Sequence, residues 1–256
     1  MSAINVMHLA AGGGGSCHVA DALGFNNQLA VEINEYRQAI LAQNWPNMAI
    51  HPNLESDYHV RHSIDIAFAG PPCPKFSRNG RGLGSNLWPA ALVWIIKYGP
   101  SVILLENSER ILSVENKPYL NFITDTLHRC GFNMEWDVFT AHETGAQHKR
   151  ARFFLFAYTN RDGLDRARLS VRKGQDGVYI PARLDRDTAW DREAVLFKQS
   201  GQSRFLRNDY GLADWKHRIS MLGDGWCVPQ AIHAFGYLSN RALSTARCYE
   251  RPATLR

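Results

Sequence analysis

The first 160 residues alternate short apolar runs with stretches in which apolar residues recur three and four positions apart. The short runs are typical of buried strands, and the longer stretches are typical of helices packed on them. This alternation predicts right-handed crossovers and therefore an α/β fold with a doubly wound, mostly parallel sheet. The predicted strands are Asn5–Leu9, Gln28–Glu32, Ile64–Ala69, Ser101–Leu105 and Arg152–Tyr158, and the predicted helices are Asn34–Asn44, Leu87–Lys97 and Pro118–Arg129.

The pattern changes after Thr159. Between Arg161 and Trp215, charged residues mix with glycines and short apolar pairs, and a compact helical pattern resumes only at Val228–Leu238. We interpret the change as a boundary, with a main domain at 1–160, a small module at 161–214, and a segment at 215–256 that returns to the main domain. One continuous domain with a long, ragged surface loop is the alternative.

Composition narrows the class of protein. Of the 256 residues, 45% are hydrophobic and 21% are charged, which indicates a folded globular chain and not a disordered one. The formal net charge of +5 permits a polyanionic partner without demonstrating one. The five cysteines are scattered without a Cys-x-x-Cys pair, and the ten histidines show no paired ligand spacing, so we expect neither a disulfide framework nor a metal. Neither a signal peptide nor a membrane span is recognisable, and the expected location is the cytoplasm.

The first candidate site is a glycine-rich turn, Gly12–Gly15, between the first predicted strand and a following helix. Glycines let the backbone approach a ligand, and the free N–H groups of a helix N-terminus attract an anion. Glu32, about 20 residues later, ends the second predicted strand, where an acidic residue can bind ribose hydroxyls. Together they indicate a nucleoside-containing cofactor; a flexible turn with a surface glutamate is the alternative.

The second candidate site is Cys73, which lies among prolines directly after the predicted strand Ile64–Ala69. The prolines fix the backbone, and ligands bind at the carboxyl ends of strands in doubly wound sheets. A thiol at this place is a nucleophile if its pKa is lowered, whereas residue type alone favours a buried, inert cysteine. The glycine-rich, basic residues at 77–85 predict a loop able to close over a phosphodiester.

Two further segments carry charged groups at predicted strand ends. Glu106 follows the strand Ser101–Leu105, and Arg150 and Arg152 enter the strand that ends at Tyr158. Alternate residues of a strand share a face, so the two arginines can project together. The alternatives are that Glu106 is an ordinary acid at a strand end and that the two arginines belong to a solvated basic turn.

In order along the chain, these four segments resemble the motifs of the cytosine-C5 DNA methyltransferase family. A fifth segment, Leu222–Gln230, is similar to the late Gly-Asn-x-Val-Val-Pro segment of that family. The resemblance implies the class I fold of enzymes that use S-adenosylmethionine (AdoMet), with a last strand antiparallel to the rest of the sheet. It also implies that the small module at 161–214 recognises the target.

The resemblance further implies the reaction, which is methyl transfer from AdoMet to C5 of a cytosine flipped out of duplex DNA. Cys73 would attack C6, Glu106 would hydrogen-bond the N3 edge, and Arg150 and Arg152 would hold the base carbonyl and the neighbouring backbone. The residues implied to contact DNA phosphates are Ser77, Arg78 and Arg81. The residues implied to bind the cofactor are Ala10, Ala11, Gly12, Gly14, Gly15, Glu32, Ile33, Asn53, Pro71, Leu87, Asp224 and Gly225.

The chain departs from the family pattern at several of these positions. Ala10 replaces a phenylalanine, Ile33 replaces a residue that is frequently aromatic, and either Asn53 or Asp57 could serve as the acid of the third motif. Asp224 replaces an asparagine near the methionine part of the cofactor, where its charge would repel the AdoMet carboxylate unless the aspartate is protonated or paired.

Three alternatives follow from these residues. One is a carboxylate-modified AdoMet from which a different group is transferred, another is a catalytically degenerate relative that binds DNA, and the third is an RNA methyltransferase. We expect a monomer that acts on duplex DNA in a bacterial or phage-infected cell, in restriction-modification or a phage context. The short recognition module predicts a short or degenerate target sequence.

Overall fold

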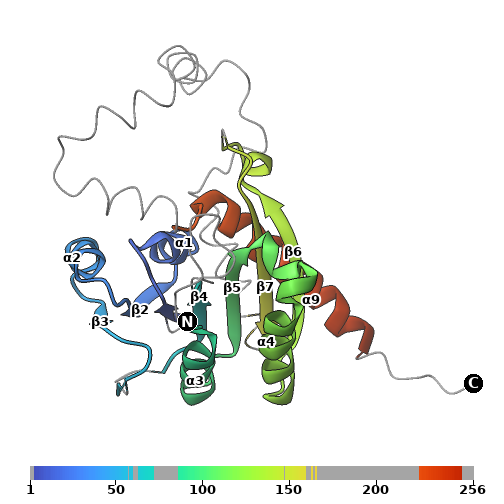
Figure 1. Cartoon of the computed structure of the whole chain (residues 1–256), viewed down its shortest axis with the longest axis horizontal. Coiled ribbons are helices and arrows are strands. Elements are labelled where there is room, and N and C mark those ends of the chain that lie inside the picture. Colours follow the sequence, from blue (N-terminus) through green and yellow to red (C-terminus); the bar gives the residue numbers. More distant parts are fainter. Residues whose placement is uncertain are drawn as a thin grey trace, which may run out of the picture.

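In a computed structural model of the chain, the described residues are 3–56, 58–59, 63–71, 86–146, 148–159, 163, 165 and 225–249. They form one seven-stranded sheet in the order β3-β2-β1-β4-β5-β7-β6 (Figure 1). The strands are β1 (Asn5–Leu9), β2 (Asn26–Val31), β3 (Ala49–His51), β4 (Ile66–Ala69), β5 (Val102–Ser108), β6 (Asn133–Thr140) and β7 (Ala151–Tyr158).

The sheet is parallel from β3 to β5 and changes direction at β7. Strand β7 pairs with β5 and with the edge strand β6, in both cases antiparallel. The predicted class is therefore confirmed: a doubly wound, mostly parallel sheet whose last strand is antiparallel. The order of connection reverses between β1 and β4, and the carboxyl ends of these two strands mark the place where such sheets bind ligands.

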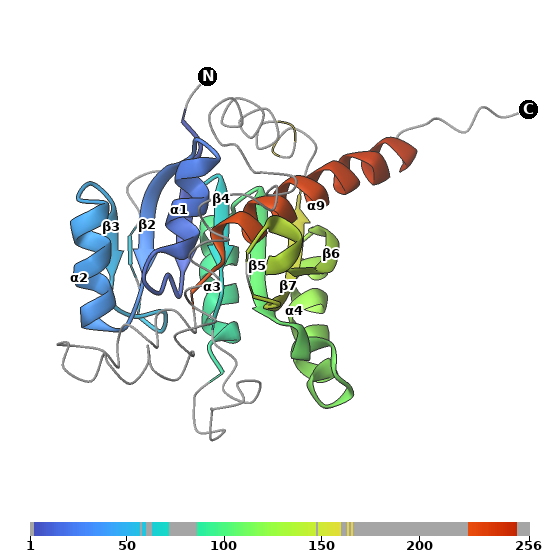
Figure 2. The ribbon, with the colours of Figure 1, turned by 90° about the horizontal axis from the view of Figure 1, so that it is seen from above.

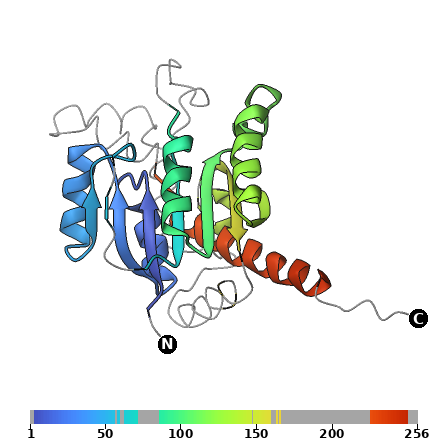
Figure 3. The same ribbon diagram turned by 90° about the horizontal axis from the view of Figure 1, so that it is seen from below.

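Helices cover both faces of the sheet (Figures 2 and 3). One face packs on α1 (Gly15–Ala22) and α9 (Val228–Tyr249), through a core that includes Phe68, Phe156 and Phe235. The opposite face packs on α3 (Trp88–Tyr98) and α4 (Lys117–Arg129), through Leu92, Ile123 and their neighbours. The remaining helical elements are α2 (Glu35–Asn44) and the short 3-10 helices η1 (Glu109–Leu112), η2 (Val114–Asn116) and η3 (Ala141–Thr144).

The structure adds elements that the hydrophobic pattern did not predict. Strand β3 has only three residues, and β6 lies at the sheet edge with mostly half-buried side chains, so neither forms an apolar run. Helix α9 continues eleven residues beyond the predicted end at Leu238, to Tyr249. Apart from residues 163 and 165, the predicted module at 161–214 lies outside the described residues. Within the described parts of the chain, no helix combines the length and apolar character needed to cross a membrane.

A buried histidine connects β1 to strand β2 and to helix α1. His8 is fully buried, with Nε2 2.7 Å from Asn27 Oδ1 in β2 and Nδ1 3.0 Å from Ser16 Oγ in α1. Burial lowers the pKa of His8 from 6.5 to about 4, so the ring is neutral near pH 7. Nε2–H then donates to Asn27, and Nδ1 accepts from the Ser16 hydroxyl. The ring thereby fixes the start of α1 over the first strand.

This histidine predicts a loss of stability in mild acid. Between pH 6.5 and about 4 the unfolded chain protonates His8 while the folded chain does not, so the free energy of unfolding falls as the pH is lowered through this window. The loss attributable to His8 is about 3 kcal/mol, complete near pH 4 and absent above pH 6.5. Urea unfolding across this range measures it, with His8→Gln compared with the exposed His128→Gln. Equal pH dependence in wild type and His8→Gln would contradict the prediction.

Candidate functional site

The described part of the candidate site lies at the carboxyl edge of the parallel strands (Figure 1). There the turn after β1, the end of β4 and the end of β5 lie side by side, because β1 pairs with β4 and β4 pairs with β5 in parallel register. Strand β7 runs antiparallel to β5 and therefore begins at this same edge. Four of the segments singled out in the sequence thus meet in one place.

The turn after β1 has a backbone that ordinary residues seldom adopt. Ala10, Gly12 and Gly14 have φ angles of 56°, 61° and 93°. The buried Glu32, only 5% exposed, holds the turn: its Oε2 accepts from the Gly12 N–H at 2.7 Å and its Oε1 accepts from the Asn34 N–H at 2.9 Å. Glu32 is therefore not a surface side chain, and its carboxylate faces the turn as a nucleoside-binding site requires.

The indole ring of Trp45 packs against the turn after β1 at Gly14. The ring of Trp45 occupies the space that a Cβ on Gly14 would need. It is held in place by a hydrogen bond from its Nε1 to Asp21 Oδ2 at 2.9 Å and by an edge contact with His18 at 4.8 Å between ring centroids. The sequence reasoning missed Trp45, since nothing in its position along the chain indicates a contact with residue 14.

The other predicted cofactor residues surround the same edge. Ile33, directly after Glu32, is 72% exposed. Asn53 follows β3 and closes a turn of its own by accepting the Glu55 N–H at 2.8 Å. Leu87 precedes α3 and packs against the core, whereas Asp57 lies outside the described residues.

A shielded ion pair connects β5 to β7. Arg152 Nε lies 2.8 Å from Glu106 Oε1, with the Glu106 side chain 8% exposed and that of Arg152 22% exposed. Glu106 lies opposite Phe154, and Ser108 lies opposite Arg152, so the antiparallel register brings the carboxylate and the guanidinium together across the strand pair. The other oxygen, Oε2, is 3.4 Å from the point that a Cβ on Gly70 would occupy, which places it beside the end of β4.

Arg150 makes a different contact from its neighbour Arg152. Its Nη2 donates to the carbonyl of Gly225 at 2.7 Å, and its own carbonyl accepts from Gln230 Nε2 at 2.9 Å. Gln230 is fully buried and also donates to the carbonyl of Phe139 at 2.7 Å. The segment at 225–230 is thus tied to the start of β7. The sequence reasoning did not identify Gln230 as a site-supporting residue, although a glutamine in the first turn of an apolar helix is a signal for a buried hydrogen bond.

The described residues end at Pro71 on the side of the predicted nucleophile. The carbonyl of Pro71 accepts from Asn107 Nδ2 at 3.3 Å, which fastens the end of β4 to the residue after Glu106. The predicted site residues Cys73, Ser77, Arg78, Arg81 and Asp224 lie outside the described residues.

Three cysteines lie among the described residues. Cys227 is half-buried in the segment tied to Arg150, whereas the other two offer no competing nucleophile at this edge. Cys17 is fully buried in α1, and burial raises the pKa of its thiol far above the usual range. Cys130 is exposed beyond the end of α4. The described residues also contain no group of three or more His, Cys, Asp or Glu side chains arranged to hold a metal ion.

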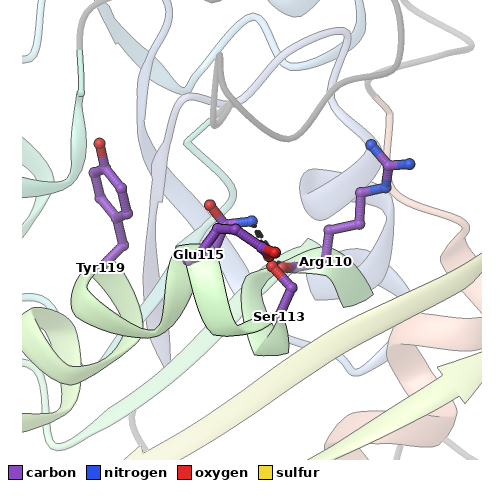
Figure 4. Close-up of a pocket in the computed structure, with 5 residues that line it drawn as sticks. Arg110, Ser113, Glu115 and Tyr119 are labelled. Atoms are coloured by element: carbon purple, nitrogen blue, oxygen red, sulfur yellow. Dashed lines mark hydrogen bonds between the residues drawn. The ribbon is translucent and has the colours of Figure 1, made fainter.

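A polar hollow lies beyond β5, on η1, η2 and the start of α4 (Figure 4). Asn116 closes one side of it, donating from Nδ2 to the Arg110 carbonyl at 2.9 Å and to Ser113 Oγ at 3.0 Å. None of the residues predicted for the site lines it. The lining residues are Arg110, Ser113, Glu115, Asn116 and Tyr119.

Comparison with known proteins found a family model and curated relatives that match this chain. Residues 4–189 match the model of the C-5 cytosine-specific DNA methylase family. The chain is 27% identical over 172 residues to the Type II methyltransferase M.NaeI of Lentzea aerocolonigenes, covering 63% of this chain and 41% of that protein. It is 28% identical over 163 residues to M.NgoMIV of Neisseria gonorrhoeae, covering 60% of this chain and 51% of that protein. The chain therefore spans about half the length of these curated relatives.

A solved structure supports the fold. A variant of Spodoptera frugiperda DNMT2 superposes with a TM-score of 0.52 at 22% identity, covering 62% of this chain and 51% of that one. At this identity the likeness concerns the fold alone.

The support of the turn by Trp45 predicts a difference between two glycine substitutions. Gly14→Ala and Gly24→Ala both put a side chain at positive φ, but a Cβ at Gly24 meets no atom within 4 Å. Gly24→Ala should cost about 1–2 kcal/mol of unfolding free energy. Gly14→Ala should cost about 1–3 kcal/mol more, because the methyl group displaces the indole ring. Urea unfolding of both variants measures the difference, and equal losses would show that Trp45 does not support the turn.

Proposed function

The chain belongs to the C-5 cytosine-specific DNA methylase family, and from that membership we propose that it transfers a methyl group from AdoMet to C5 of cytosine in DNA. The observation that carries the proposal is the Glu106–Arg152 pair beside the end of β4. It places a carboxyl group next to Gly70, and Gly70 is three residues before Cys73 in the sequence. Family membership supports the proposed class of reaction, and this pair supports the proposed position of the base.

The turn after β1 fits a bound nucleoside-containing cofactor. Glu32 already accepts two backbone N–H groups, and each of its oxygens retains a lone pair for a ribose hydroxyl. The start of α1 at Gly15 presents free N–H groups to a carboxylate, and the exposed Ile33 offers an apolar surface to a purine ring. When bound, AdoMet supplies an electrophilic methyl group.

We propose AdoMet itself as the donor. The altered donor considered because of Asp224 has no support among the described residues, since Asp224 lies outside them. The roles of Ala10, Ala11, Pro71, Leu87 and Gly225 at the cofactor remain part of this proposal.

The proposed chemistry uses Cys73 and Glu106 on opposite parts of one ring. The Cys73 thiolate forms a bond to C6 while the C5–C6 π electrons move toward C5. Glu106 would hydrogen-bond the N3 edge and favour protonation of N3, which draws electron density from the ring. Arg152 would hold the Glu106 carboxyl group in place and face the base carbonyl. C5 then takes the methyl group, and S-adenosylhomocysteine would be the product that leaves. Water takes up the C5 proton, the electrons of the C5–H bond re-form the C5–C6 double bond, the Cys73 thiolate leaves C6, and the proton on N3 is released.

The proposed substrate is cytosine in duplex DNA. A stacked base cannot reach a buried carboxyl group, so the target has to leave the helix at a cost of a few kcal/mol. Ser77, Arg78 and Arg81 would bind the flanking phosphates, and the residues at 161–214 would recognise the target sequence. Because the curated relatives are Type II methyltransferases, we place the enzyme in restriction-modification, acting as a monomer in the cytoplasm.

The first test concerns the nucleophile. Plasmid DNA from cells that express the wild-type chain should contain cytosine heavier by one methylene unit, and DNA from cells that express Cys73→Ala should not. Cys130→Ser is the matched control, because Cys130 is an exposed thiol remote from the site. Nucleoside mass spectrometry measures all three.

The outcomes separate the alternatives. Modification by the wild type and Cys130→Ser alone supports the proposal. A heavier cytosine adduct that depends on Cys73 would point to a different donor. Absence of any modification, together with retained DNA binding, would favour the degenerate relative, and modification found only in RNA would favour the RNA enzyme.

The second test concerns Glu106. Glu106→Gln keeps the shape of the side chain but cannot exchange a proton with N3, and kcat should fall by about 100-fold to 10,000-fold. Binding of the product S-adenosylhomocysteine, measured by calorimetry, should stay unchanged because Glu32 and the turn after β1 are intact. The matched control is Glu109→Gln, an exposed acid three residues later. A Glu106→Gln variant as active as wild type would remove Glu106 from the mechanism.

A further inference from the structure

The short segment 225–227 lies between the start of α1 and the end of β4. It is fixed by the Arg150 Nη2 bond to the Gly225 carbonyl at 2.7 Å and by the Ala231 N–H bond to the Cys227 carbonyl at 3.0 Å. The central residue of the segment is Trp226. Its backbone and its side chain contact different parts of the site.

The backbone of Trp226 lies against the start of α1. A Cβ built on Gly15 would be 2.9 Å from the Trp226 nitrogen and 3.2 Å from its carbonyl oxygen. This contact is made by main-chain atoms and by the Trp226 Cβ at 3.1 Å, all of which a valine at position 226 retains.

The indole ring of Trp226 lies against the end of β4. A Cβ built on Gly70 would be 2.6 Å from Trp226 Nε1, and the same point is 3.4 Å from Glu106 Oε2. The ring and the carboxylate therefore flank one small space beside the last residue before Pro71. Movement of the indole ring would therefore change how closely Gly70 can approach the Glu106 carboxylate.

Two core phenylalanines hold the indole in that position. Its centroid lies 5.7 Å from Phe68 of β4 with an interplanar angle of 31°, and 6.0 Å from Phe154 of β7 with an angle of 86°. Phe154 is the cross-strand partner of Glu106. The ring is thus packed on the same two strands that carry the site, in the tilted and edge-on arrangements that aromatic pairs favour.

We propose that Trp226 is a positioning residue for methyl transfer. Its indole ring keeps the end of β4, and with it the beginning of the segment that carries Cys73, at a fixed distance from the Glu106 carboxyl group. Trp226 acts through Gly70 and takes no part in bond making or breaking. The inference rests on the proposed function and adds to it a residue that the family pattern does not supply.

The division of contacts predicts a division of kinetic effects. Trp226→Val removes the ring from Gly70 but leaves the main-chain contact with Gly15, so the KM for AdoMet should stay within about threefold while kcat falls by about 100-fold. The matched control is Trp136→Val, which removes a half-exposed indole from β6 and should leave both constants unchanged.

A double-substitution cycle tests the contact itself. Gly70→Ala puts a methyl group into the indole ring and should lower both the unfolding free energy and kcat. In Gly70→Ala/Trp226→Val the ring is gone, so the double variant should turn over about tenfold faster than Gly70→Ala alone. Urea unfolding without DNA or cofactor should also show coupling. The double variant should lose less unfolding free energy than the sum of the losses of the two single variants.

The results separate this inference from the proposed function. If the wild type methylates DNA and Trp226→Val does so at the same rate, or if the two substitutions are additive in both measurements, the positioning role is wrong and the methyltransferase proposal stands. If the wild type transfers no methyl group, the proposed function fails, and with it the kinetic role. Additive unfolding free energies would then also reject the Gly70–Trp226 contact on their own.

Discussion

Burial of the parallel strands on both faces is the constraint on which the rest of the structure depends. Strands β1, β4 and β5 lie between two helical layers, and almost all of their side chains are buried. A polar group in the middle of such a strand needs a complete set of partners, as His8 has in Ser16 and Asn27. Groups that must meet a ligand are therefore confined to the carboxyl edge, where the strands give way to turns.

At this edge, the charged side chains of the site have fixed partners. Glu32 is matched by two backbone N–H groups, Glu106 by the Arg152 guanidinium and Arg150 by the Gly225 carbonyl. Preorganised partners of this kind spare the site the reorganisation that water would require during a reaction. The same contacts join segments that are far apart in the sequence. The interactions that stabilise the charges therefore also hold the segments of the site together.

The sequence predicts the parts of the fold that depend on local pattern. The strands β1, β4 and β7 can be predicted because their burial requires apolar residues at nearly every position. Glu32, Glu106 and Arg152 can be predicted because each is a charged residue at the end of such an apolar run. Strands β3 and β6 are not visible, one being too short and the other only half buried. Trp45, Trp226 and Gln230 are not visible either, because their importance lies in long-range contacts with Gly14, Gly70 and Arg150. No periodicity records such contacts.

Helix α9 has a consequence for the order in which the molecule is built. All seven strands precede residue 160, yet Phe235 and Leu238 of α9 complete the core over one face of the sheet. During synthesis the seven strands therefore leave the ribosome more than 60 residues before α9. Until then Phe68 and Phe156 lack the part of their cover that Phe235 supplies. Trp226 and Gln230 arrive with the same late segment. The helix that completes this core and the residues that tie the segment 225–230 to the site are therefore synthesised together, well after the strands.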